Sequence, residues 1–122
     1  MSHVAVSPTG DFIAAFFRDA GNSQWHLGVF SPDGSSLIHS YALPATFELP
    51  VAWTADGRGL AYTDTQNGVS NIVVQPIDGG PIKPLTNFKS DRIFWFDISH
   101  DGKQIAVSRG TQSSDVVLIK DF

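Results

Sequence analysis

Short apolar runs separated by polar turns cover this chain, and helical periodicity is almost absent. The runs are four to seven residues long and rich in Val, Ile, Phe and Trp, with Gly, Pro, Asn and Asp between them. Runs of that length and composition, bounded by turn-forming residues, predict β-strands. We therefore expect an all-β chain.

One pattern of strand, turn and strand occurs three times. The turns are Ser7-Pro8-Thr9-Gly10, Thr54-Ala55-Asp56-Gly57 and Ser99-His100-Asp101-Gly102, each between two apolar runs. The first two of these turns end in glycines that lie 47 residues apart, and the last two glycines lie 45 apart. A repeat of that length built from strands and turns indicates the blades of a β-propeller.

The second repeat shows how four strands follow one another. Its expected strands are 51–53, 60–63, 71–75 and 82–85, with Asp-Gly or Asn-Gly in the turns between them. Such turns favour hairpins because glycine adopts positive φ at no steric cost. Ser31-Pro32-Asp33-Gly34 resembles a fourth copy, but its glycine lies only 24 residues after Gly10. We expect it to join the third and fourth strands of the first repeat.

The spacings predict one partial propeller over residues 1–122, with blades at about 4–50, 51–95 and 96–122. The first two blades are expected to have four strands, and the last to lack its fourth strand. Propellers have roughly four to eight blades, and an open array leaves terminal faces and edges uncovered. We therefore expect either the C-terminal part of a longer propeller or a homodimer that closes a ring of about six blades.

The composition of the chain excludes some classes of function. The 122 residues are 42% hydrophobic and 16% charged, with a formal net charge of −4 and only 8 Lys and Arg. A nucleic-acid-binding surface needs a clustered basic face, which this chain does not show. The absence of cysteine excludes disulfides and thiolate chemistry. No signal peptide or membrane-spanning run is apparent, so the sequence itself does not indicate a compartment.

The turns and their flanking strands resemble the TolB-like, WD-like family of bacterial β-propellers. The similar residues of the second repeat are 53–58, Leu60-Ala61-Tyr62, Asp78-Gly79-Gly80 and Leu85-Thr86, and those of the third are 98–106. The resemblance covers nearly the whole chain and departs from the family pattern at Thr9, Ala55 and His100. It implies a propeller fold, a binding or sensing role and an extracytoplasmic or periplasmic location.

The C-terminal part of the chain resembles one particular group of these propellers. Residues 108–111 and 115–119 are similar to the C-terminal end of propellers appended to bacterial serine/threonine protein kinases. That similarity implies a sensor domain that follows a kinase. The chain itself has no Gly-rich phosphate loop, no His-Arg-Asp and no Asp-Phe-Gly, so it implies no kinase activity in these residues.

No constellation of catalytic or metal-binding residues stands out. The four histidines, His3, His26, His39 and His100, have no metal-ligand spacing. The recurring aspartates are expected to accept backbone hydrogen bonds in turns. Four aromatic residues near the first strands are expected to pack one blade against the next, namely Trp53, Phe94, Trp95 and Phe96. We expect no catalytic site, no metal and no cofactor.

The loops that join second to third strands (B–C) and fourth strands to the next repeat (D–A) are expected to form one face, where propellers often bind partners. The candidate binding residues on this B–C/D–A face are Arg18, Asp64, Asp91, Arg92, Arg109 and Asp115. Arg109 and Asp115 flank one loop and could instead pair with each other. The favoured function is a non-catalytic module that binds a protein or a small ligand. The alternative is part of a propeller lyase or of a glycan or peptide hydrolase, whose active site lies largely outside this chain.

Overall fold

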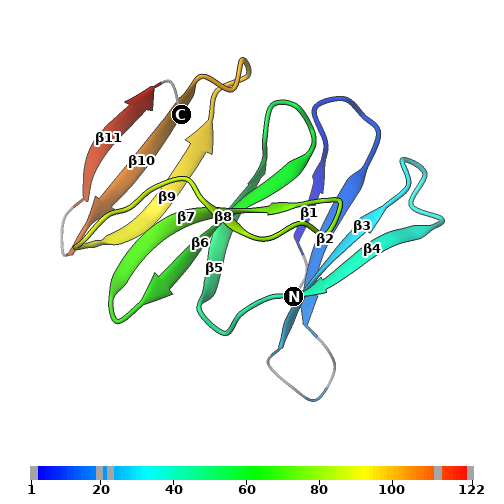
Figure 1. Cartoon of the computed structure of the whole chain (residues 1–122), viewed down its shortest axis with the longest axis horizontal. Helices are drawn as coiled ribbons and strands as arrows, with labels where there is room; N and C mark the ends of the chain where they lie inside the picture. Colours follow the sequence, from blue (N-terminus) through cyan, green and yellow to red (C-terminus); the bar gives the residue numbers. More distant parts are fainter. Residues whose placement is uncertain (1–2, 19–20, 22–23, 112–113, 121–122) are drawn as a thin grey trace.

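The computed structural model of the chain describes residues 3–18, 21, 24–111 and 114–120. All regular structure in those residues is β-strand, arranged as three antiparallel sheets that stand side by side in chain order (Figure 1). The predicted all-β, propeller-type fold with two four-stranded sheets and a last three-stranded sheet is confirmed. The described residues contain no helix long and apolar enough to cross a membrane.

Each sheet is formed by strands that follow one another in the chain. The first sheet contains β1 (His3–Val6), β2 (Ile13–Arg18), β3 (Trp25–Phe30) and β4 (Leu37–Ala42). The second contains β5 (Phe47–Trp53), β6 (Gly59–Gln66), β7 (Val69–Pro76) and the short β8 (Lys83–Pro84). The third contains β9 (Arg92–Ile98), β10 (Gln104–Gly110) and β11 (Ser114–Lys120). The second and third sheets thus begin at Phe47 and Arg92, a few residues before the expected blade boundaries at 51 and 96.

The repeated turns share one hydrogen-bond arrangement. In the turn at 99–102 the Gly102 N–H donates to the Ser99 carbonyl at 2.9 Å, and the Ser99 hydroxyl donates to Asp101 Oδ1 at 2.6 Å. The turns at 54–57 and 31–34 repeat both bonds. The turn at 31–34 joins β3 to β4, as its spacing predicts. The aspartates therefore recur because they hold turns together, which agrees with the structural role expected for them.

The second sheet is buried on both faces. Along β6, Leu60 and Tyr62 point into an apolar cluster shared with the first sheet, which includes Phe16 and Trp53. Ala61 lies between them and points the other way, into a cluster shared with the third sheet. Alternate residues of a strand face opposite sides of its sheet. One strand therefore contributes to both inter-sheet cores.

The outer faces of the first and third sheets have no such neighbour among the described residues, and they carry exposed apolar side chains. On the third sheet Trp95 is 59% exposed and Val116 is 77% exposed. The expectation that Trp95 and Phe94 pack between blades is not met here, because both are exposed, whereas Trp53 and Phe96 are buried. The residue before a buried strand position points outward, so Trp95 faces away from the neighbouring sheet that Phe96 contacts.

Candidate functional site

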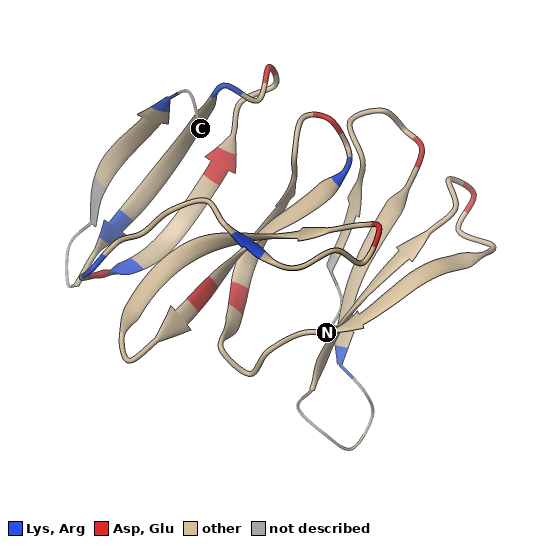
Figure 2. Cartoon of the chain, in the orientation of Figure 1, with Lys and Arg blue, Asp and Glu red and all other residues tan. Residues whose placement is uncertain are grey.

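Five of the predicted binding residues lie where strands meet the B–C turns and D–A loops, and the sixth, Asp91, lies within a D–A loop. Strand register places Asp64 opposite Phe47, and Arg109 and Arg92 at neighbouring positions of β10 and β9. Figure 2 shows that charged positions lie mainly near the ends of the strands and in the loops that join them. The structure therefore places these residues at one end of the sheets, as the strand order requires.

Glu48 is the centre of the polar contacts on this face. Its Oε2 accepts a hydrogen bond of 2.9 Å from the Arg92 guanidinium, which makes an ion pair between the second and third sheets. Its Oε1 accepts a hydrogen bond from the Thr65 hydroxyl. The Thr65 hydroxyl in turn lies 2.6 Å from the hydroxyl of the buried Ser70. The carboxylate is thus held from two sides while remaining partly exposed.

A cavity of about 400 Å³ opens beside this ion pair. It is lined by residues of β5, β6, β9, the loop before β5 and the turn after β6. We call it the Glu48 cavity; its lining is Ala45, Thr46, Phe47, Glu48, Thr65, Gly68 and Arg92. Asp64 lies nearby, where it accepts hydrogen bonds from the Thr46 hydroxyl and from Gln66 Nε2. A carboxylate and a guanidinium at the edge of one cavity can bind opposite charges of a partner.

The other predicted residues are held by different contacts. The Arg109 guanidinium lies 3.8 Å from the centre of the Phe88 ring and donates a hydrogen bond of 2.6 Å to the Ser90 carbonyl. The Arg18 guanidinium lies over the Trp25 ring at 4.9 Å. Asp91 has a positive φ of 73°, and its carbonyl accepts a hydrogen bond from the Ser70 N–H. The structure thus brings Arg92 to the edge of the Glu48 cavity and Asp64 to its neighbour Thr46, whereas Arg109 contacts the loop before β9 and Asp91 lies within that loop.

Asp115 pairs with Arg109 in backbone register, but its side chain lies outside the described part of the structure. The Arg109 side chain contacts Phe88 and Ser90, which belong to a different loop.

Sequence reasoning missed Glu48, Thr46 and Thr65. Glu48 was assigned to the end of the first blade, so it was not expected to face Arg92, 44 residues later. A signal was present, because 47–53 alternates apolar and polar residues at its start. A strand beginning at Phe47 would have placed Glu48 at the same end of the sheets as Asp64.

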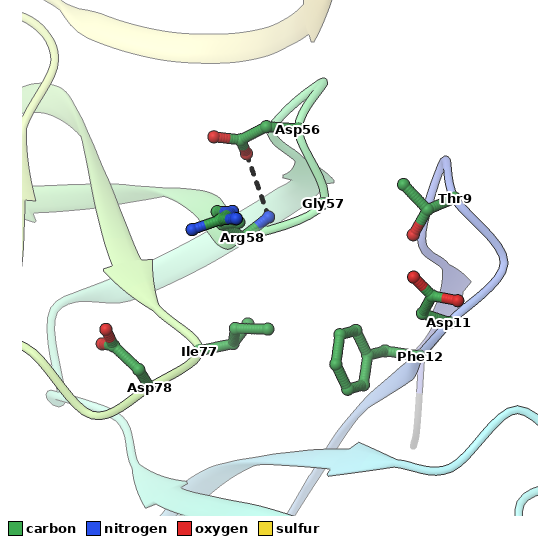
Figure 3. A pocket seen from close by; sticks show the side chains of 8 residues that line it. All are labelled: Thr9, Asp11, Phe12, Asp56, Gly57, Arg58, Ile77 and Asp78. Atoms are coloured by element: carbon green, nitrogen blue, oxygen red, sulfur yellow. Dashed lines mark hydrogen bonds between the residues drawn. The ribbon is translucent and has the colours of Figure 1, made fainter.

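A larger cavity of about 500 Å³ lies at the opposite end of the strands, between the first and second sheets. We call it the inter-sheet pocket; it is lined by Thr9, Asp11, Phe12, Asp56, Gly57, Arg58, Ile77 and Asp78 (Figure 3). Figure 3 shows the Phe12 and Ile77 side chains pointing toward each other, with Asp11 and Thr9 on the side of Phe12 and Asp56, Arg58 and Asp78 on the side of Ile77. Asp56 and Asp78 were expected to stabilise turns, and a cavity enclosed by three turns was not predicted.

The carboxyl groups of the repeated turns are stabilised in their ionised form. The hydrogen bond from the Thr54 hydroxyl, followed by that from the Arg58 N–H, lowers the pKa of Asp56. The Ser99 hydroxyl lowers the pKa of Asp101 in the same way. Among the described residues, no three or more His, Asp or Glu side chains are grouped so as to hold a metal ion.

Comparisons with known proteins agree with this architecture. No protein-family profile matches the chain. The chain is 37% identical over 71 residues to Tol-Pal system protein TolB of Hydrogenovibrio crunogenus, which is 57% of this chain and 16% of that protein. It is also 37% identical over 59 residues to Tricorn protease homolog 1 of Streptomyces coelicolor, which is 48% of this chain and 6% of that protein. The matched segments thus span less than a fifth of the length of each of these relatives.

Two solved structures share its fold. TolB from Acinetobacter baumannii matches 99% of this chain and 41% of its own, with a TM-score of 0.55 and 19% identity. Hydrazine synthase from Kuenenia stuttgartiensis matches 97% of this chain and 39% of its own, with a TM-score of 0.64 and 13% identity. Together with the repeated sheets and turns, these similarities show that the chain has a TolB-like β-propeller fold.

Proposed function

We propose that the chain is part of a β-propeller module that binds a protein partner through its B–C/D–A face. The observation that carries this proposal is the Glu48 cavity, whose edge bears a carboxylate and a guanidinium from neighbouring sheets. Both side chains keep part of their surface exposed, at 38% for Glu48 and 52% for Arg92. A net charge of −4 disfavours nucleic acid as the partner.

The Glu48–Arg92 ion pair contributes little to the free energy of folding, so substitutions in it can test binding without a large loss of stability. Exposed ion pairs stabilise proteins by about 0–1 kcal/mol. Substituting Arg92→Gln or Glu48→Gln should therefore leave the fold intact, and any loss of partner binding would reflect the lost contact.

Site-directed photo-crosslinking in the source cell tests this proposal. A photoreactive residue at Ala45, on the edge of the Glu48 cavity, should give a discrete adduct with a protein of defined mass. The same residue at Ser35, on the exposed turn between β3 and β4, is the control and should not give that adduct. Loss of the Ala45 adduct in the Arg92→Gln variant would support the proposal. Equal adducts at Ala45 and Ser35, or an Ala45 adduct indifferent to Arg92→Gln, would overturn it.

The module belongs, in our proposal, to a longer bacterial polypeptide with an extracytoplasmic location, as the similarity to TolB suggests. The exposed apolar outer face of the third sheet supports this, because such a face is normally covered by a further blade. The competing arrangement is a homodimer that closes a ring. Light scattering over a dilution series separates the two, since only the homodimer gives a discrete mass of two chains that persists on dilution.

Two finer expectations stay predictions. One is that the propeller follows a serine/threonine kinase, which the sequence upstream in the gene would test. The other is the alternative of a propeller enzyme with most of its active site outside this chain. Turnover that is abolished by a substitution on the B–C/D–A face would favour that alternative.

A further inference from the structure

A second site lies at the end of the strands opposite the proposed binding face. The inter-sheet pocket is enclosed by the turns at 7–12 and 54–58 and by the turn that follows β7. It therefore belongs to two sheets, and neither sheet alone would form it. Nothing in the proposed partner contact at Glu48 involves these turns.

The floor of the pocket is apolar and firmly positioned. Phe12 stacks on the buried Trp53 ring with 6.3 Å between ring centres, and both Phe12 and Ile77 pack against the apolar cluster between the first two sheets. The backbone of Ile77 is held on both sides. Its N–H donates to the Arg58 carbonyl at 3.0 Å, and its carbonyl accepts from the Tyr41 hydroxyl at 2.6 Å.

The rim of the pocket is predominantly acidic. It carries the carboxylates of Asp11, Asp56 and Asp78 and a single guanidinium, that of Arg58. Asp56 and Asp78 each use Oδ1 to accept a backbone hydrogen bond within their own turns. The Asp11 carboxylate makes no hydrogen bond or ion pair with any residue that the structure describes. The rim thus has a formal excess of two negative charges.

This combination determines the chemistry of the ligand. An apolar floor beneath an acidic rim fits a side chain with a hydrocarbon stem and a cationic end, and lysine and arginine have this form. An anionic ligand would meet the excess negative charge, and a bare metal ion would leave the apolar floor without a contact. We propose that the inter-sheet pocket binds a lysine or arginine side chain presented by a protein segment.

A titration of the whole chain with small probes tests the proposal. The probe is N-acetyl-lysine-N′-methylamide, and the norleucine analogue, which has the stem without the charge, is its control. Amide shifts in an NMR spectrum should appear at Asp11, Gly57, Arg58 and Asp78 with the lysine probe and be much weaker with norleucine. Equal binding of the two probes, or shifts spread evenly over the surface, would overturn the proposal.

Three substitutions make the test specific, and each changes the charge of an exposed side chain. Asp11→Asn should weaken binding about threefold or more, as expected for losing one charge contact. Arg58→Gln should strengthen binding, because it removes the one repelling cation from the rim. Asp33→Asn, in an equivalent turn outside the pocket, removes the same charge as Asp11→Asn and should leave binding unchanged. If Asp33→Asn weakens binding as much as Asp11→Asn, attraction to the overall charge explains it and the pocket does not.

Discussion

The Tyr41 hydroxyl of the first sheet donates a hydrogen bond of 2.6 Å to the Ile77 carbonyl of the second sheet. The two residues are 36 positions apart in the chain, and the bond holds the backbone of Ile77, which lines the inter-sheet pocket. Burial, together with the nearby Asp78 charge, raises the pKa of Tyr41, so its hydroxyl stays protonated and able to donate at neutral pH.

Removing this hydroxyl should loosen the junction between the first two sheets. The Tyr41→Phe substitution leaves the Ile77 carbonyl without its partner. We expect it to lower the free energy of unfolding by about 1 kcal/mol, the usual net contribution of a hydrogen bond. Urea unfolding followed by circular dichroism measures this change. An unchanged midpoint would show that water replaces the hydroxyl without cost.

The other tyrosine is the matched control. Tyr62 is fully buried, and its hydroxyl has no hydrogen-bond partner among the described residues. Burial raises its pKa to about 12, so the group is neutral as well as unpaired. Burying an unpaired polar group is costly. We therefore expect Tyr62→Phe to leave stability unchanged or to raise it, in contrast to Tyr41→Phe.

The two tryptophans Trp53 and Trp95 should respond very differently to truncation. Trp53 is only 7% exposed, stacks on Phe12 and donates from its indole N–H to the Ala5 carbonyl at 3.1 Å. Trp53→Ala should cost about 3–5 kcal/mol, as large aromatic deletions from a core do. Trp95→Ala should change stability by less than about 0.5 kcal/mol if the outer face of the third sheet is free. A large loss for Trp95→Ala in the isolated chain would show that this face is covered in solution.

Gly102 should tolerate a side chain less well than Gly34, although both occupy the last position of equivalent turns. Their φ angles are 72° and 77°, so alanine at either position is strained by about 1–2 kcal/mol. A Cβ on Gly102 would also meet the Ala55 Cβ at 2.6 Å, whereas a Cβ on Gly34 meets nothing within 4 Å. Thermal unfolding should therefore show a larger loss for Gly102→Ala than for Gly34→Ala. Adding Ala55→Gly to Gly102→Ala should recover the difference, and failure to recover it would exclude the clash as the cause.

Stability should fall in acid through the turn carboxylates. The Ser35 N–H and hydroxyl and the Ser31 hydroxyl lower the pKa of Asp33 from 3.8 to about 2, and similar bonds lower the pKa of Asp56 and Asp101. Because the folded state holds these protons less tightly than the unfolded chain, the stabilisation is fully present above pH 3.8. It is lost as the pH falls toward 2. The urea midpoint measured between pH 5 and 2 should drop, and the Asp33→Asn variant should show a shallower drop. Parallel curves for the two proteins would contradict this.

The strand-and-turn layout was predictable because each sheet is formed from consecutive residues. Alternation of apolar residues and the Asp-Gly and Asn-Gly turns are local signals, and they indicate strands and hairpins without knowledge of the rest of the chain. The place where the second sheet begins was less clear. Phe47 is separated from Val51 by Pro50, and the register shifts between Glu48 and Val51, so the strand does not show an unbroken alternation.

The two cavities depend on distant residues and could not be predicted in this way. Arg92 meets Glu48, and the turn that carries Asp11 meets the turn that carries Asp78, only after three sheets have packed at a particular angle. The sequence correctly indicated which end of the sheets Asp64 and Arg92 would share. It did not indicate that Phe94 and Trp95 would both be exposed, because a shift in strand pairing between Ser108 and Arg109 breaks the alternation in that part of β9.

Because β6 contributes to both inter-sheet cores, it affects how the three sheets unfold. Leu60 and Ala61 are adjacent in the chain, but they stabilise different junctions, the first toward β2 and β3 and the second toward β9 and β10. In a linear array of this kind, cooperativity passes only between nearest neighbours. Among the described residues, the second sheet shares an apolar core with both the first and the third sheet. A ligand that tightens one of these junctions therefore restrains a sheet that also forms the other junction.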